Sequence, residues 1–384
     1  MNDNFLKSNV FAIFFLFLFT AALPAKEKQK GEKQNLRVLY WNTQNGVWSG
    51  QGDNYDTFVK WVSEKDPDVC VWAEAASVFK TDSQETIKDP KGKYLPDGWG
   101  ELAQRYGHNY VWKSGQRDNY PQVITSKYPI ENVLQSVGNQ KDTVVMHGFG
   151  HAKIEVEGRT INIVTVHLYP FSYLTANMKE PAELKKYRLA REAAKKAYDE
   201  AASGNTSETD LAVLKAEMER TAEEHRKCRK AVYDLSTRNY EGESYRRMEM
   251  EYITRHTILK SADPERECWL MCGDFNCVTH KDNFFYKWGN ASPSFMVHRY
   301  IENDVPAYYD IVSEHFPGIF CKSLMSNMRI DYVYVTKPLL KASTKVSCGT
   351  DWYTRQSVWE PYTHFKLPSD HIPVMVDFNI SKIK

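Results

Sequence analysis

The stretch LMCGDFN at residues 270–276 reads as a short apolar strand that stops at Gly273 and delivers Asp274 and Asn276 into a loop. A buried strand that ends in a carboxylate and a carboxamide is unusual as packing alone, because both groups need polar partners at that depth. The same construction recurs several times along the chain. This recurrence predicts both the architecture of the protein and its function.

Polar side chains mark one end of each of six expected strands. Four segments rich in β-branched and aromatic residues end in such a side chain, and two begin with one. Where parallel and antiparallel neighbours are mixed, the ends of some strands and the beginnings of others meet at one edge. We therefore expect a single pocket that is lined by Asn42, Glu74, His167, Asp274, Asn276, Asp331, Asp370 and His371.

The expected pocket holds four carboxylates, two carboxamides and two histidines. Carboxylates that lie a few ångströms apart raise one another's pKa, and a divalent cation would relieve that repulsion. Ligands that are all oxygens favour Mg²⁺, with Mn²⁺ or Ca²⁺ as alternatives, over zinc. Because Mg²⁺ usually completes its shell with water and phosphate oxygens, the pocket is suited to hydrolysis of a phosphoester.

The first 25 residues have the features of a secretory signal peptide. Lys7 precedes an apolar run at residues 10–19, and small residues follow the run up to Ala25. The run is short for a bilayer span, so no stable membrane span is expected after cleavage, although an uncleaved anchor is the alternative. We therefore expect an exported protein, periplasmic or extracellular.

The composition of the 384-residue chain is that of a folded, core-rich protein, with 42% hydrophobic residues and a formal net charge of +1. We expect one domain over residues 36–384, preceded by a flexible tether at residues 26–35. The near-neutral charge predicts that an anionic substrate is captured locally rather than by the whole molecule. The seven cysteines lack the spacing of a disulfide framework, which leaves open any bridges among Cys268, Cys277, Cys321 and Cys348.

Between about residues 180 and 240 the composition changes to Ala, Glu, Lys and Arg, with apolar residues three or four positions apart. This spacing predicts two helices joined by a short linker, an antiparallel hairpin inserted into the domain. The hairpin leaves the core just after His167, so it could grip a substrate, or it could be a stable insertion with solvated charges. Elsewhere we expect a helix over residues 245–259 and a strand over residues 144–146.

Six motifs occur in an order that is seen in one known family. They are Asn42 after the first strand, Pro67-Asp68 followed by Glu74, His167, Gly273-Asp274-Phe275-Asn276, Arg329-Ile330-Asp331-Tyr332 and Ser369-Asp370-His371. In this order they resemble the endonuclease/exonuclease/phosphatase superfamily, which includes deoxyribonuclease-like nucleases, apurinic endonucleases, neutral sphingomyelinases and inositol polyphosphate phosphatases. The resemblance implies an α/β fold, a four-layer α/β sandwich of two packed mixed β-sheets flanked by helices. The helical hairpin lies outside the family pattern.

The resemblance also implies which residues hold a metal. Glu74 is the implied principal ligand of Mg²⁺, helped by Asn42 and Asp370. The ion would polarise the phosphoryl oxygens and stabilise the leaving oxygen.

The other residues of the pocket have implied catalytic roles. Asp331 and His371 form an implied carboxylate–imidazole pair that activates or orients water, or binds phosphate. Asp274 competes with this pair for the orientation of the water. Asn276 is implied to bind the phosphate, and His167 to protonate the leaving group or to stabilise the transition state.

The sequence as a whole predicts a divalent-metal-dependent phosphoester hydrolase, best described as a phosphodiesterase. It leaves open whether the substrate is a nucleic acid, a phospholipid or a small phosphodiester, and it implies no obligate protein partner. A non-specific nuclease of the same superfamily is one alternative, although no cluster of Lys and Arg accompanies the motifs. A catalytically silent secreted binding protein that uses the helical hairpin is the other.

Overall fold

The computed structural model describes residues 35–48, 54–78, 95–116, 120–137, 144–171, 182–204, 206–232, 241–347, 349 and 369–383. Residues 35–384 pack as one unit. The predicted signal peptide, nearly all of the predicted tether and Cys348 lie outside the described residues.

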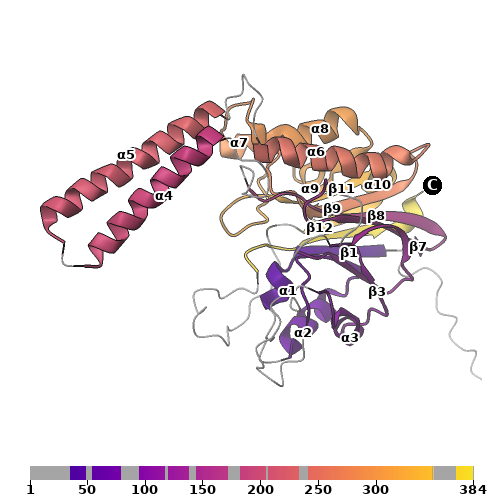
Figure 1. The fold of residues 1–384 in the computed structure, drawn as a ribbon. Helices are drawn as coiled ribbons and strands as arrows, with labels where there is room; N and C mark the ends of the chain where they lie inside the picture. The colour runs from indigo at the N-terminus through magenta and orange to yellow at the C-terminus, as the bar shows by residue number, and fades with distance from the viewer. Residues whose placement is uncertain are drawn as a thin grey trace, which may run out of the picture. The chain divides into compact units, whose positions relative to one another are not determined.

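Two mixed β-sheets form the centre of this unit and share a core between their facing sides (Figure 1). Among the described residues the first sheet has six strands in the order β12-β13-β1-β2-β5-β3. Its strands are β1 (Asn35–Asn42), β2 (Val69–Ala73), β3 (Tyr110–Lys113), β5 (Val123–Ser126), β12 (Ser343–Ser347) and β13 (Val374–Asn379).

The second sheet has seven described strands in the order β10-β11-β9-β8-β7-β6-β4. Its strands are β4 (Gly115–Gln116), β6 (Glu131–Val137), β7 (Phe149–Val156), β8 (Arg159–His167), β9 (Cys268–Asp274), β10 (Tyr308–Asp310) and β11 (Asp331–Thr336).

The central strands are buried on both faces, which explains why they read as continuous apolar runs rather than alternating ones. In β1, Val38 and Tyr40 face the core between the sheets. Leu39 and Trp41 point the other way, into a cluster with residues of α2 (Asp56–Lys65) and α3 (Trp99–Arg105). Strand β9 alternates in the same manner between the central core and a cluster with α6 (Glu241–His256) and α8 (Met296–Asp304).

Helices cover the outer face of each sheet (Figure 1). The first sheet is covered by α2 (Asp56–Lys65) and α3 (Trp99–Arg105), and the second by α6 (Glu241–His256) and α8 (Met296–Asp304). The predicted four-layer sandwich of two mixed sheets flanked by helices is thereby confirmed. The remaining helices of the domain are short: α1 (Gln44–Trp48), α7 (Asn283–Tyr286), α9 (Ile311–His315), α10 (Lys337–Ala342), η2 (Ile258–Lys260), η3 (His280–Asp282), η4 (Pro293–Phe295) and η6 (Ile380–Lys382).

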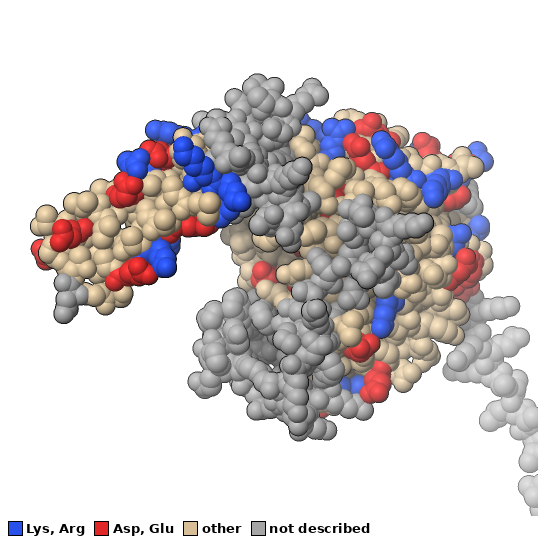
Figure 2. Space-filling view, in the orientation of Figure 1, with Lys and Arg blue, Asp and Glu red and all other residues tan. Residues whose placement is uncertain are grey.

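The inserted helical hairpin is also confirmed. Helices α4 (Ala182–Ala202) and α5 (Glu208–Val232) pack along each other (Figure 1). Acidic and basic side chains are interspersed along them (Figure 2), and several form ion pairs one helical turn apart, such as Lys195 with Asp199. None of the described helices combines the length and the apolar character that a membrane span requires.

The register of the strands brings the polar ends together at one edge. Strands β1 and β2 are parallel, as are β8 and β9, where His167 lies opposite Asp274. Strand β11 runs antiparallel to β9, so its first residue, Asp331, also lies opposite Asp274. Gly273 permits this approach, because a Cβ at that position would overlap the carbonyl group of Val166 in β8.

The strand predicted over residues 144–146 is wrong. The segment forms bends rather than a ladder, and the backbone N–H of Met146 donates to Oε1 of Glu249 at 2.7 Å. The apolar sequence predicted burial correctly for Val145, but a side chain of α6 takes the hydrogen bond that a neighbouring strand would have taken.

Arg329, just before β11, is fully buried and held by two carboxylates. Its guanidinium donates to both oxygens of Asp310 at 3.0 and 2.8 Å and to Oδ2 of Asp282 at 2.6 Å. Burial disfavours the charge on Asp310, but Arg329 outweighs it and lowers the pKa of that carboxyl. This network joins the segment before β11 to η3 and to the end of β10, and thereby fixes the position of Asp331.

Replacing Arg329 with Met should destabilise the protein by about 3–5 kcal/mol, because two buried carboxylates lose their partner. Urea unfolding followed by tryptophan fluorescence measures the effect. Arg220→Met is the matched control, since Arg220 pairs with Glu217 and Glu224 on the exposed surface of α5. Equal midpoints for the two variants would contradict the structural role of Arg329.

Candidate active site

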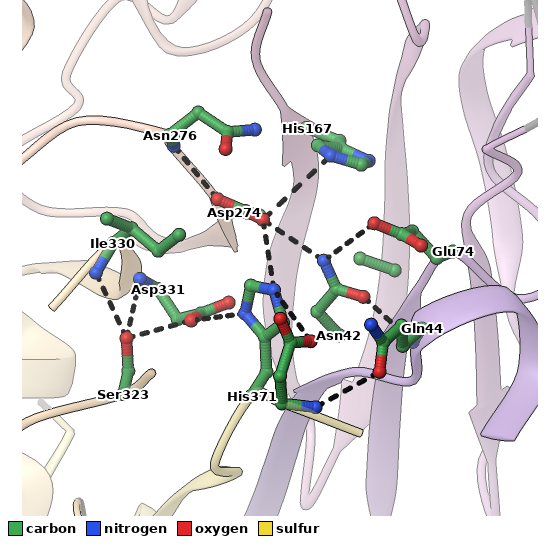
Figure 3. A network of polar contacts seen from close by, with 12 residues as sticks. Asn42, Gln44, Glu74, His167, Asp274, Asn276, Ser323, Ile330, Asp331 and His371 are labelled. Carbon is green, nitrogen blue, oxygen red and sulfur yellow. Dashed lines mark hydrogen bonds and ion pairs between the residues drawn. The ribbon is translucent and has the colours of Figure 1, made fainter. Parts of the chain in front are cut away.

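All eight residues predicted for the pocket lie at the edge where the strand ends meet. Figure 3 shows most of them in one polar network whose members come from both sheets and from the segment before β13. Chain positions as far apart as Asn42 and Asp274 are joined directly, with Asn42 Nδ2 donating to Asp274 Oδ2 at 3.0 Å. The sequence-based prediction of one shared edge is therefore correct in its geometry.

Asp331 and His371 form a hydrogen-bonded pair at the centre of the network. Nδ1 of His371 lies 2.8 Å from Oδ2 of Asp331, and both side chains are buried. The Tyr40 hydroxyl donates to the other oxygen of Asp331 at 2.9 Å, and Ser323 Oγ donates to Oδ2 at 2.8 Å. Every oxygen of Asp331 thus has a partner, and the orientation of His371 is fixed.

The surrounding carboxylates keep His371 protonated. Burial opposes the positive charge, but Asp331, through its charge and hydrogen bond, and then Asp274 outweigh burial and raise the pKa of His371 to about 10. At neutral pH the ring is therefore an imidazolium, with Nδ1–H donated to Asp331 and a second N–H at Nε2, which lies 3.7 Å from Asp274 Oδ2. An imidazolium suits the binding of an anionic oxygen better than the abstraction of a proton.

Asp274 lies between the two predicted histidines. Its Oδ2 is 3.7 Å from Nε2 of His371 and 3.9 Å from Nε2 of His167, while Oδ1 accepts the backbone N–H of Asn276 at 2.9 Å. Burial, followed by the charge of Asp331, raises the pKa of Asp274 to about 7. A carboxyl group with this pKa can exchange a proton at neutral pH.

Glu74 and Asp370 provide the remaining carboxylates of the edge. Glu74 directly follows β2 with φ 50°, a left-handed conformation that a non-glycine residue adopts at some cost. Its oxygens accept from Asn42 Nδ2 and from the backbone N–H of Asn45, both at 3.2 Å, and burial raises its pKa. The backbone N–H of Asp370 donates to Gln44 Oε1 at 3.1 Å.

The donor set of this corner fits a hard divalent cation. The Asn42 amide group lies between the carboxylates of Glu74 and Asp274, where a positive charge would be most favourable. Oδ1 of Asp370 and Oδ1 of Asn45 are buried and have no hydrogen-bond partner among the described residues. Mg²⁺ and Ca²⁺ prefer oxygen ligands of this kind, and these two oxygens belong to the same edge as the carboxylates of Glu74 and Asp274.

Asp274, Asp331 and His371 can also place one ligand atom each within 4.8 Å of one another. Asp331 is unsuited to a metal, however, because Tyr40, Ser323 and His371 already occupy its oxygens. Asp370, whose Oδ1 has no hydrogen-bond partner among the described residues, and Glu74 therefore suit the ion better than Asp331 does. Asn42 Oδ1 accepts the backbone N–H of Gln44 at 3.0 Å and keeps a second lone pair for the ion.

His167 ends β8 and stays uncharged. Its burial, and after that the charges of His147 and His371, hold the pKa of His167 well below its usual range. A neutral imidazole donates one N–H but has no proton to give away easily. The geometry therefore favours stabilisation of a transition state by His167 over protonation of a leaving group.

Asn276 has φ 50° and projects beside Asp274 toward the same side as His167 (Figure 3). Its Nδ2 donates to the carbonyl oxygen of Leu168 at 2.8 Å, which uses one of its two N–H donors. The second N–H is left for a substrate oxygen.

Several residues of the network were not foreseen. Tyr40 carried a usable signal, because it lies two positions before Asn42 and thus on the same face of β1. Ser323 lies in an irregular segment, where neither periodicity nor a strand end marks it. Gln44, the first residue of α1, and His147, which follows the segment expected as a strand, were not singled out, and Ser369 was quoted in a motif without a role.

Comparison with known proteins identifies the family. A sequence model described as the Endonuclease/Exonuclease/phosphatase family matches residues 39–371. A search of curated proteins found no match.

Solved structures of similar fold include an AP endonuclease from Archaeoglobus fulgidus (14% identity, 89% of this chain and 99% of that one, TM-score 0.42). The human Nocturnin catalytic domain with bound sulfate is 11% identical over 90% of this chain and 93% of that one, with a TM-score of 0.46. A 3′ phosphatase from Neisseria, bound to a product DNA hairpin, is 13% identical over 89% of this chain and 99% of that one, with a TM-score of 0.45. From the match of the family model, the chain belongs to the Endonuclease/Exonuclease/phosphatase family, whose members are hydrolases that act on phosphoesters.

Proposed function

We propose that this protein is an exported phosphodiesterase that depends on a divalent cation, with Mg²⁺ as the physiological ion. The observation that carries the proposal is the edge network itself. Asn42 joins the carboxylate of Glu74 to that of Asp274, whose pKa is about 7, and Asp274 lies 3.7 Å from a protonated His371. Metal ligands, a cationic donor and a proton acceptor are the parts that phosphoester hydrolysis requires.

Each residue of the network receives one task. Glu74, Asp370 and Asn42 would hold the cation, which supplies Lewis-acid stabilisation of the phosphoryl oxygens. Asp274 orients the attacking water and accepts its proton, because its pKa lies near neutral pH whereas that of His371 is far above it.

The remaining residues contact the phosphate. His371 donates from Nε2 to a phosphoryl oxygen, while Asp331 fixes its ring through Nδ1. Asn276 donates its second amide hydrogen to the phosphate. His167 donates an N–H to the charge that develops in the transition state.

The charge of the site favours a diester over a monoester. Among the described residues, the ion pairs of the site carboxylates are with His167 and His371 and not with lysine or arginine, so His371 is the protein cation that offsets negative charge in this part of the structure. A phosphodiester brings one negative charge, whereas a phosphomonoester at neutral pH brings close to two. A phosphodiester therefore matches the charge of this site better than a phosphomonoester does.

Export of the protein is proposed from the sequence, since the apolar run at residues 10–19 with its flanking Lys7 and Ala25 is typical of a signal peptide. The substrate class stays a matter for experiment. The purified protein should be assayed with Mg²⁺ and with chelator on plasmid DNA, RNA, sphingomyelin, inositol phosphates and a chromogenic phosphodiester. Metal-dependent cleavage of plasmid DNA or RNA would make it a nuclease, and no hydrolysis at all would favour the catalytically silent binding protein.

His371→Ala should lower kcat on the cleaved phosphodiester by about a hundredfold or more, because a charged donor to the phosphate is lost. The protein should remain folded, as checked by circular dichroism. His315→Ala is the matched control, since His315 contacts Ser343 away from the network. Full activity of purified His371→Ala would contradict the proposed mechanism.

Mg²⁺ should raise the Tm of the wild-type protein, because an ion that binds only the folded state stabilises it. Glu74→Gln should remove most of this increase, since the amide cannot replace the charge of the ligand. Glu64→Gln, at an exposed position in α2, should keep the whole increase. Differential scanning calorimetry with and without the ion measures the effect. An unchanged increase in Glu74→Gln would place the cation elsewhere.

A further inference from the structure

His167 differs from His371 in how its ring is held. Nδ1 of His371 is fixed by Asp331 at 2.8 Å, but Nδ1 of His167 is buried with no hydrogen-bond partner among the described residues. The other ring nitrogen, Nε2, lies 3.9 Å from Asp274 Oδ2, which is too long for a hydrogen bond. The orientation of His167 must therefore come from its packing neighbours and from the backbone.

Two rings pack against His167. The ring of His147 lies at a centroid distance of 4.2 Å with an interplanar angle of 38°. Tyr120 contacts both histidines edge-on, at 4.8 Å from His147 and 5.9 Å from His167. His147 is itself buried, so a shift of its backbone would move the surface on which His167 rests.

A single carboxylate from α6 holds the backbone next to both histidines. Oε1 of Glu249 accepts the N–H of Met146, the residue before His147, at 2.7 Å. Oε2 accepts the N–H of Tyr169, two residues after His167, at 2.8 Å. One rigid group thus links two segments that are distant in sequence and that carry the stacked rings.

Neighbouring side chains of α6 strengthen the same link. Arg246 is buried and donates to the carbonyl oxygens of Tyr169 and Phe171 at 2.7 and 3.0 Å. The Tyr245 hydroxyl donates to the carbonyl oxygen of Val144. Helix α6 therefore binds the segment before His147 and the segment after His167 at several points.

Burial of the Glu249 carboxylate costs free energy that an apolar residue at this position of α6 would not cost. The side chain is fully buried, and burial raises its pKa to about 7. Helix α6 already packs on the second sheet through apolar residues such as Met250 and Ile253. Unlike apolar contacts, the carboxylate forms directional hydrogen bonds to two backbone N–H groups, those of Met146 and Tyr169.

We propose that Glu249 and His147 are positioning residues for His167: Glu249 joins the two backbone segments, and His147 provides the surface that orients the ring. This inference rests on the proposed function, because it assigns to the pair an effect on the chemical step. Neither residue belongs to the motifs by which the chain resembles its family.

Glu249→Gln tests the link with little change in volume. Glutamine offers one acceptor oxygen and an amide that cannot accept, so either Met146 or Tyr169 loses its acceptor. We expect kcat on the cleaved phosphodiester to fall about tenfold to a hundredfold, with KM within about twofold, because a small misplacement of a catalytic group acts on the transition state. Glu251→Gln, two residues along, is the control, since Glu251 pairs with Arg247 and Arg255 and touches neither segment.

A double-mutant cycle separates positioning from general stability. In a His167→Ala background, Glu249→Gln should lower kcat by less than about twofold, because the group that it positions is already absent. The same substitution should keep its full effect in an Asn276→Ala background. A loss from Glu249→Gln that is equally large with and without His167 would overturn the inference, whatever the change in Tm.

His147→Gln tests whether the ring of His147 orients His167. This variant provides the test if Glu249→Gln does not fold. It should lower kcat, again only while His167 is present. Wild-type kcat in both single variants would overturn the positioning role and leave the proposed function intact. Absence of metal-dependent hydrolysis by the wild-type protein on the whole substrate panel would instead overturn the proposed function, and the inference with it.

Discussion

The burial of carboxylates at one edge of the two sheets is the constraint on which the rest of the structure depends. Asp331 and Asp274 lie side by side on neighbouring strands, with Glu74 on the other side of Asn42. Buried negative charges at such distances repel one another strongly unless donors or cations offset them. Tyr40, Ser323 and Asn42 supply donors and His371 supplies a cation, but burial and then the charge of Asp331 still raise the pKa of Asp274. A divalent ion would offset the remaining negative charge.

The fold produces this edge by strand pairing within each sheet and by packing of the two sheets on each other. Parallel pairs bring the last residues of β1 and β2, and of β8 and β9, to one side, and antiparallel β11 and β13 contribute their beginnings there. The pairing register of a strand that is buried on both faces is fixed, because a shift by one residue would move every side chain to the opposite face of the sheet. The same packing that stabilises the sandwich thus sets the distances between the polar side chains. Positive φ angles occur close to this edge, at Glu74 and Asn276 after β2 and β9 and at Gln44 and Asn45 in α1.

Much of this arrangement could be predicted from the sequence, because the strands are strongly apolar and their polar ends are few. The shared edge followed from that pattern, the hairpin insertion from the spacing of apolar residues at about 180–240, and the sandwich from the resemblance to the family. Ser323 and Glu249 could not be predicted, because their importance lies in contacts with residues far away in the chain, Asp331 in one case and Met146 with Tyr169 in the other. The segment before His147 was expected to be a strand for the same reason, since an apolar run does not reveal that a helix side chain will take its hydrogen bond. Protonation states, too, required the structure: the motif of Asp370-His371 does not show that His371 is a cation.

The most direct test of the central claim is a crystal structure of the protein with Mn²⁺ as an anomalous stand-in for Mg²⁺. The account predicts an anomalous peak between Glu74 and Asp370, with carboxylate oxygens near the distance of roughly 2.0–2.1 Å that is usual for Mg²⁺. A crystal in which Mn²⁺ binds away from Glu74, or in which the edge holds no ion at saturating concentration, would contradict it. In that case hydrogen-bond donors and cations of the protein alone would offset the buried charge of the carboxylates.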